Sequence, residues 1–220
     1  RDVSVSSLIR STDPALSAIA VAGGKVRIGA SVTMAAIARH PDLGTLARAA
    51  RAVGGPAIRN MATVGGNLFA PAPYGDFAVA LLALDASVTF EAADGQKTVD
   101  IETFLSARGR KAARIVRSIA FDIPPPGAFR FAKVVRHKPH GASVLAIAAT
   151  LPVAGGKLSG VRVAYGAMAP TAIRARAVEK ALEGKALDAA AIEAAGKVAT
   201  VGCAPQTDAF ASDWYRLNVL

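Results

Sequence analysis

The sequence has almost no cysteine, because Cys203 is the only one in 220 residues. A disulfide framework is therefore excluded, and so is an iron–sulfur cluster held by this chain alone, since such clusters commonly need four thiolates. Histidine is also scarce, and none of His40, His137 and His140 has a partner at zinc-ligand spacing. No serine sits in a nucleophile elbow. The sequence thus lacks the usual groups for hydrolysis or metal catalysis.

Aromatic residues are also few, and long apolar runs are absent. Aromatics are 5% of the chain, and the basic residues behind the net charge of +10 are spread along it rather than clustered. We therefore rank nucleic-acid binding low, and expect the positive field to attract an anionic cofactor or an acidic partner subunit. Apolar runs are shorter than the roughly 20 residues that span a bilayer, and no signal peptide is recognisable. We expect a cytoplasmic protein without a membrane span.

What the sequence does contain is a large apolar fraction in two kinds of pattern. Hydrophobic residues make up 52% of the chain, enough for one domain or two closely packed ones. Alternating residues around Gly23-Gly24 and Asp94-Gly95 predict β-hairpins, while the apolar run 77–84 predicts a helix. We predict an α+β fold whose C-terminal part is a small antiparallel sheet with helices on one face.

Three consecutive prolines, Pro124 to Pro126, are the best candidate for a domain boundary. Proline fixes φ and bars regular strand pairing, so such a run forms a stiff, extended spacer. The sequence therefore predicts a first domain over residues 1–123 and a C-terminal domain over residues 124–220.

The stretch Thr63-Val64-Gly65-Gly66-Asn67 concentrates ligand-binding groups. Paired glycines let the backbone adopt positive φ and let N–H groups converge into a nest for a phosphate or pyrophosphate, to which Thr63 and Asn67 add donors. The alternative is a simple tight turn, for which these residues are equally suited. Asp76 lies just before a helical run, where it is expected to act as N-cap and to point a carboxylate at a ligand hydroxyl. A phosphate nest without acid–base machinery indicates that a cofactor does the chemistry.

The motif Ile58-Arg59-Asn60-x-x-Thr63-Val64-Gly65-Gly66-Asn67, followed by Asp76, resembles the second flavin-binding segment in the FAD subunit of molybdenum hydroxylases. This family includes the medium subunits of carbon monoxide dehydrogenase and of bacterial xanthine dehydrogenase-like enzymes. The resemblance covers nearly all of the chain, through Arg27-Ile28-Gly29-Ala30-Ser31-Val32-Thr33 upstream and Gly166-x-x-x-Pro170-x-x-x-Arg174 downstream.

The resemblance implies that the chain binds FAD. Thr63 to Asn67 match the loop that binds the pyrophosphate, and Asp76 matches a carboxylate that contacts the cofactor. Phe131 and Lys133 match an aromatic-x-lysine near the flavin ring, where a cation stabilises the negative charge that reduction adds. The alternative makes Lys133 a solvated strand residue and Phe131 part of the core. In full, the cofactor-binding residues implied are Val53, Thr63, Val64, Gly65, Gly66, Asn67, Asp76, Arg117, Phe131 and Lys133.

The resemblance also implies a fold of the vanillyl-alcohol-oxidase (PCMH) type for the first domain. Family members carry an N-terminal subdomain with an Ala-Gly-Gly-type loop, which forms the other half of the pyrophosphate site and does not appear here. Either the sequence is a fragment, or that segment is absent and flavin binding is compromised. We expect an upstream glycine-rich loop in the native polypeptide, and weak FAD binding without it.

The implied function is electron transfer within a molybdenum hydroxylase. Electrons from a large molybdopterin-binding subunit pass through the [2Fe-2S] clusters of a small subunit to FAD on this chain, and then to NAD or another acceptor. Two alternatives remain open, namely a flavin-free structural subunit of the same assembly and a stand-alone flavin oxidase. The substrate is not readable from this chain, because the molybdenum subunit selects it.

Overall fold

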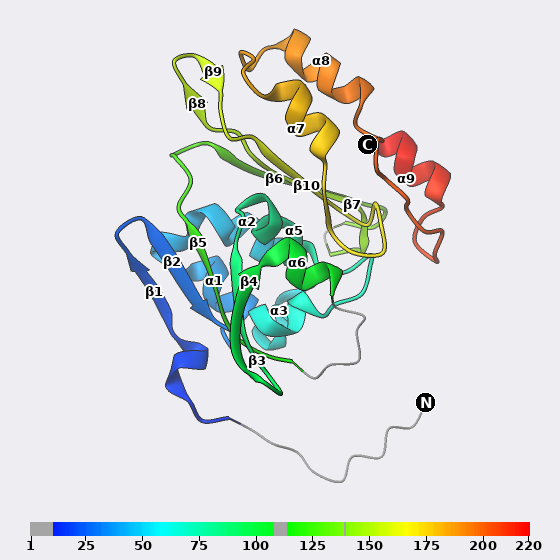
Figure 1. Ribbon diagram of the computed structural model, residues 1–220. Coiled ribbons are helices and arrows are strands. Elements are labelled where there is room, and N and C mark those ends of the chain that lie inside the picture. The colour runs from blue at the N-terminus through cyan, green and yellow to red at the C-terminus, as the bar shows by residue number, and fades with distance from the viewer. Residues whose placement is uncertain (1–10, 108–113, 139) are drawn as a thin grey trace.

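The structure, a computed structural model, describes residues 11–107, 114–138 and 140–220 (Figure 1). The strands are β1 (Ile19–Ala22), β2 (Lys25–Gly29), β3 (Ser87–Ala92), β4 (Gly95–Asp100), β5 (Ile115–Asp122), β6 (Phe129–Val135), β7 (Ser143–Thr150), β8 (Val153–Ala154), β9 (Lys157–Leu158), β10 (Arg162–Gly166) and β11 (Ile173–Arg174). The helices are η1 (Pro14–Ser17), α1 (Met34–Arg39), η2 (Pro41–Leu43), α2 (Gly44–Ala52), α3 (Pro56–Met61), α4 (Val64–Leu68), α5 (Asp76–Ala83), α6 (Ile101–Ser106), α7 (Arg176–Leu182), α8 (Ala189–Lys197) and α9 (Asp213–Val219). In the part of the chain described, none of the helices has both the length and the apolar character that crossing a membrane needs.

The first sheet has the strand order β1-β2-β5-β3-β4, and all its neighbours pair antiparallel. The two predicted hairpins are confirmed as β1–β2 and β3–β4. Alternation then decides which face is buried: Val26 and Ile28 of β2 face inward together with Ile119 of β5. Helices α1, α2 and α5 cover this inner face (Figure 1).

The second sheet has the order β11-β10-β7-β6 and is antiparallel, as predicted. Both faces of this sheet carry buried residues. Phe131 and Ala148 belong to the same core as helix α5, whereas Val163 and Tyr165 belong to a second core under α7 and α8. The C-terminal helices α7 and α8 cover one face, as predicted, and helices of the first half of the chain cover the other face (Figure 1).

Helix α5 lies between the two sheets, which explains why it is apolar on all sides (Figure 1). Its residues Phe77 to Ala83 are at most 3% exposed. Strand β10 passes so close that a Cβ added to Gly166 would lie 2.6 Å from Cγ2 of Val79. The helix therefore has a fixed position, and its first residue, Asp76, lies next to the second sheet.

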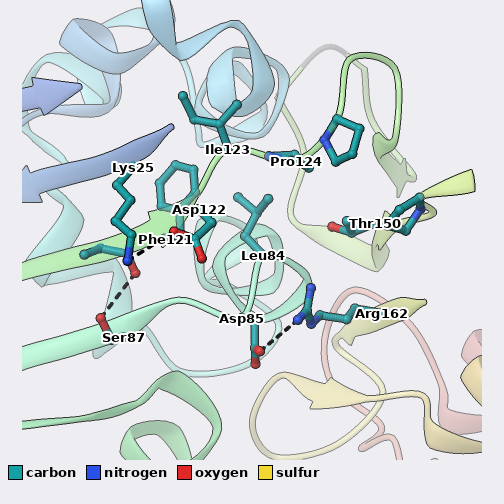
Figure 2. Close-up of a pocket in the computed structure, with 13 residues that line it drawn as sticks. Lys25, Leu84, Asp85, Ser87, Phe121, Asp122, Ile123, Pro124, Thr150 and Arg162 are labelled. Carbon is teal, nitrogen blue, oxygen red and sulfur yellow. Dashed lines mark hydrogen bonds and ion pairs between the residues drawn. The ribbon is translucent and has the colours of Figure 1, made fainter. Parts of the chain in front are cut away.

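The proline run 124–126 joins the two halves beside a hollow of about 350 Å³ (Figure 2). Arg162 reaches across to Asp85, with 3.1 Å between guanidinium and carboxylate. Thr150 donates its hydroxyl to the carbonyl of Ala83 at 2.7 Å, which fixes the C-terminal end of α5 to strand β7. The second sheet is thus tied to α5 and to the turn that follows it.

The C-terminal helix α9 is attached through Arg216, which is 1% exposed and bonded to Asp208 at 2.8 Å. Burial opposes ionisation of Asp208, but hydrogen bonds from the N–H groups of Phe210 and Ala211 and from Arg216 outweigh it, so that its pKa lies below the ordinary value. A carboxylate with a depressed pKa stabilises the fold above its unfolded-state pKa, and this contribution disappears as the pH falls through the folded-state pKa.

We expect Asp208→Asn to lower the free energy of unfolding by about 1 to 2 kcal/mol at pH 7, where the full charge pairing of Asp208 is present. The difference from wild type should begin to shrink below about pH 4, the ordinary pKa of an aspartate, and disappear as the pH falls through the lowered pKa of Asp208. Urea unfolding between pH 7 and pH 3 measures it, with Trp214 on α9, the only tryptophan in the sequence, as the fluorescent probe. A difference that is the same at every pH would contradict this assignment.

Candidate cofactor site

A cleft of about 400 Å³ opens at the N-terminal end of helix α5. Segments far apart in the sequence line it, and they carry six of the residues singled out from the sequence: Val53, Thr63, Gly66, Asn67, Asp76 and Lys133. Its volume is in the range of small-molecule and cofactor sites. The structure therefore brings together groups from α2, α4, α5 and β6 that the sequence placed up to 80 positions apart (53 to 133).

The segment Thr63 to Asn67 is a short helix rather than a nest with positive φ. Thr63 is the N-cap of α4, and its Oγ1 accepts from the N–H of Gly66 at 3.1 Å. Gly65 and Gly66 are helical and are not among the residues with positive φ, so that part of the prediction was wrong. The N–H of Gly65 donates to the carbonyl of Ala30 at 2.8 Å. The backbone of this segment is therefore largely occupied, which leaves side chains as its donors for a ligand.

The two glycines differ in what their missing side chains permit. A Cβ on Gly65 would lie 3.0 Å from Cβ of Ala30 and 3.2 Å from its carbonyl oxygen, so this glycine allows α4 to approach the end of strand β2. A Cβ on Gly66 would meet only Oγ1 of Thr63, at 3.2 Å. Gly66 is exposed and lines the cleft. Gly65 thus serves packing, and Gly66 keeps the cleft open.

Asn67 and Asp76 share the start of helix α5 in an unexpected way. The predicted N-cap was Asp76, but Gly75, with φ 96°, occupies that position and Asp76 is the first helical residue. The buried Asn67 accepts the N–H of Ala78 at its Oδ1, at 3.2 Å. Asn67 therefore satisfies one of the free donors at the helix start. Its Nδ2 amide makes no hydrogen bond within the described residues.

Asp76 and Lys133 form a buried ion pair at the cleft, with 2.7 Å between Nζ and Oδ2 and side chains that are 8% and 12% exposed. Lys133 also donates to the carbonyl of Ala52 at 2.9 Å. Because Ala52 ends helix α2, the lysine joins the ends of two helices to strand β6. The interpretation of Lys133 as a solvated strand residue is excluded by this burial.

The opposite wall of the cleft is apolar and is shaped by Arg59, a residue of the Ile58-Arg59-Asn60 motif to which the sequence assigned no role. Ile58 and Met61 line it and are 56% and 83% exposed. Arg59, between them, donates from Nη1 to the carbonyl of Arg51 at 3.1 Å and to that of Gly54. It thereby caps the C-terminal end of α2 and holds Val53 at the cleft.

The remaining predicted residues lie elsewhere. Val64 and Gly65 are buried behind the cleft, and Phe131, 5% exposed, is part of the core. Arg117 is paired with Asp13 at 2.7 Å and lines a separate hollow. The structure therefore does not bring Arg117 or Phe131 into this cleft.

The hollow beside the proline run is the alternative site (Figure 2). Its charged residues already pair with each other, Lys25 with Asp122 at 3.7 Å and Arg162 with Asp85. Within the described part of the chain, no group of three or more His, Cys, Asp or Glu residues is placed to hold a metal ion. We therefore take the cleft at the start of α5 as the functional site.

The chemistry of the cleft suits part of a flavin dinucleotide. Val53, Ile58 and Met61 supply an apolar wall for a flat ring. Thr63 and Asn67 offer a hydroxyl and an amide, while the Asp76 carboxylate can accept from a ligand hydroxyl. Gly66 leaves space where any side chain would intrude. The residues present therefore fit the cofactor that the sequence resemblance implied.

Two family models match the chain. Residues 3–125 match the model of the FAD binding domain in molybdopterin dehydrogenase. Residues 129–220 match the model of the CO dehydrogenase flavoprotein C-terminal domain. Together the two models cover most of the chain.

Individual relatives and a solved structure also match the chain. The xanthine dehydrogenase FAD-binding subunit of Escherichia coli O157:H7 is 30% identical over 209 residues, which are 90% of this chain and 70% of that protein. The nicotinate dehydrogenase FAD-subunit of Eubacterium barkeri is 33% identical over 138 residues, 58% of this chain and 47% of that protein. A solved structure of carbon monoxide dehydrogenase from Hydrogenophaga pseudoflava, in a form that lacks the Mo-pyranopterin moiety, superposes with a TM-score of 0.86 at 28% identity. It covers 94% of this chain and 74% of its own.

Proposed function

The chain belongs to the FAD-binding medium subunits of the molybdenum hydroxylases, and from this premise we propose that it holds FAD in the cleft at the start of helix α5. The observation that carries the proposal is the convergence of Thr63, Gly66, Asn67, Asp76 and Lys133 on one cleft from separate segments. FAD, when bound, accepts electrons and passes them on. The chain's own residues bind and orient it.

The residues of the cleft divide this task by their chemistry. We propose that the Thr63 hydroxyl and the Asn67 amide donate to the pyrophosphate, whereas the Asp76 carboxylate accepts from a hydroxyl of the cofactor. Val53, on the apolar wall, would contact the flavin ring. Lys133 supplies a positive charge that is already desolvated, so no reorganisation is needed when negative charge appears nearby.

The partners follow from the family. We propose that a small subunit with [2Fe-2S] clusters delivers electrons from a large molybdopterin-binding subunit to this chain. NAD or another acceptor then takes them. Placing the clusters on a separate subunit is consistent with the single cysteine of this sequence, which cannot supply the four thiolates that a cluster commonly needs.

We further propose that residues 1–123 are the FAD-binding domain, of the vanillyl-alcohol-oxidase type, and that residues 124–220 are the C-terminal domain. The two family models support this division, since one ends at residue 125 and the other starts at residue 129. The proline run lies at the same place. Both domains contribute to the cleft, because Lys133 comes from the second.

The visible absorption spectrum and the metal content of the complex, purified from its native host, test this function. We expect flavin absorbance that releases as FAD, together with iron and molybdenum on co-purifying subunits. A colourless but folded subunit within a complex that contains iron and molybdenum would instead identify a flavin-free structural role. Flavin without iron or molybdenum would identify a stand-alone flavin oxidase.

Removing the charge of Lys133 is expected to lower the reduction potential of the bound flavin. In Lys133→Met the negative charge of Asp76 remains without its cation, which disfavours the additional negative charge of the reduced state. We expect a shift on the order of 30 mV or more, which is about 1.4 kcal/mol for a two-electron couple. Redox titration measures it, and Asp76→Asn, which leaves the cation alone, should shift the potential upward. Equal potentials in all three proteins would place Lys133 away from the ring.

A further inference from the structure

Both oxygens of the Asp76 carboxylate are held by donors from the second sheet. Oδ2 accepts from Lys133 on strand β6, and Oδ1 accepts from the hydroxyl of Ser143, the first residue of strand β7. Ser143 is 1% exposed, so water does not compete for its hydroxyl. A carboxylate bonded on both oxygens keeps one orientation, and that orientation decides which ligand hydroxyl it can accept from.

Ser143 is itself held from the C-terminal end of the chain. Nη1 of Arg216 donates to the carbonyl of Ser143 at 3.1 Å and to that of Val144 at 2.6 Å. Its Nη2 bonds Asp208. Helix α9, which carries Arg216, lies beside strand β7 (Figure 1). A continuous set of hydrogen bonds therefore runs from α9 through Ser143 to Asp76.

We propose that Ser143 and Arg216 are positioning residues of the cofactor site, which act through Asp76. Neither lines the cleft, whereas Asp76 does. Without the Ser143 hydroxyl, the carboxylate keeps Lys133 as its one strong donor and turns toward it, so the orientation that accepts from the cofactor is populated for only part of the time. Apparent affinity falls by the same fraction. The inference rests on the proposed function, because it assumes that FAD is the ligand of Asp76.

The structure offers a matched control on the same strand. Thr150, the last residue of β7, is 3% exposed and donates its hydroxyl to Ala83 at the other end of α5. Ser143→Ala and Thr150→Val each remove one buried hydroxyl bond between β7 and α5, and both are expected to lower thermal stability, Ser143→Ala more so because its bond is to a carboxylate. Of the two hydroxyls, only that of Ser143 contacts Asp76 at the cleft, so only the replacement of Ser143 should change FAD binding.

The experiment titrates FAD into the deflavinated intact subunit in four forms: wild type, Ser143→Ala, Thr150→Val and Arg216→Lys. We expect Kd to rise about tenfold in Ser143→Ala and to stay within about twofold of wild type in Thr150→Val. Arg216→Lys, which keeps the charge but carries its donors on one nitrogen where Arg216 uses two, should give an intermediate rise. Amide hydrogen exchange adds a readout that a purely structural role would not move. By reciprocity, FAD should slow exchange in α9 of wild type and Thr150→Val but not of Ser143→Ala.

Two results would overturn the inference alone. The first is the same Kd in Ser143→Ala as in wild type, and the second is an equal rise in Ser143→Ala and Thr150→Val, which would reflect general loss of stability. Failure of the wild-type subunit to bind FAD would instead overturn the proposed function, and this inference with it.

Discussion

The Gly66→Val variant is expected to lose FAD while the protein remains folded. Gly66 lines the cleft and is exposed, so the added side chain enters the space that the cofactor needs. The protein around Gly66 can accommodate the added side chain, because its Cβ would meet only Oγ1 of Thr63. Gly66 also lies within a right-handed helix, so the penalty for a positive φ does not apply. We expect FAD affinity to fall by at least about 100-fold.

Gly65→Ala is the matched control, because it changes the neighbouring residue with the opposite result. Gly65 is buried, and its new methyl group would press against Ala30 of the strand end behind it. Overpacking of this kind costs about 1 to 3 kcal/mol. Flavin content per folded subunit and unfolding temperature separate the two variants. Normal flavin content in folded Gly66→Val would contradict the assignment of the cleft.

The contrast between the two glycines shows how far the sequence could be read. The motif from Thr63 to Asn67 identified a segment that lines the cleft, and Thr63 caps its helix. A glycine pair has the same appearance in a sequence whether it serves positive φ or a close approach of two segments, since both need the absence of Cβ. What distinguishes them here is Ala30, which lies more than thirty positions upstream. Only the tertiary fold supplies that contact.

The polar groups of the site illustrate the same limit. The resemblance to a family identified Asp76 and Lys133 as separate residues, but their partnership spans 57 positions and that of Asp76 with Ser143 spans 67. Arg216 had no signal at all, because an arginine in a short helix is usually exposed. The hairpins were predictable since each depends on a local turn, whereas the insertion of α5 between two sheets depends on contacts from the whole chain.

Substitutions of Asp76 and Lys133 should have strongly non-additive effects on the free energy of unfolding. Asp76→Asn leaves the buried lysine with the carbonyl of Ala52 as its main partner, and Lys133→Met leaves a buried carboxylate with Ser143. Breaking a buried pair by removing one member costs about 3 to 5 kcal/mol, because the other charge stays desolvated. The double variant contains no uncompensated charge. The loss of unfolding free energy in the double variant should therefore be smaller than the sum of the two single losses, by at least about 2 kcal/mol.

Urea unfolding of the four apoproteins completes the double-mutant cycle, and a surface pair of the same chain calibrates it. Lys25 and Asp122 are 3.7 Å apart with side chains 78% and 79% exposed, so neutralising them singly and together should give a coupling below about 1 kcal/mol. Additive losses at Asp76 and Lys133 would mean that water reaches the pair in solution. In that event the carboxylate and the ammonium would act on the cofactor as two screened charges, and the opposite shifts in flavin potential expected for Asp76→Asn and Lys133→Met should shrink with added salt. A coupling of about 2 kcal/mol with salt-independent potentials is the result that a desolvated pair requires.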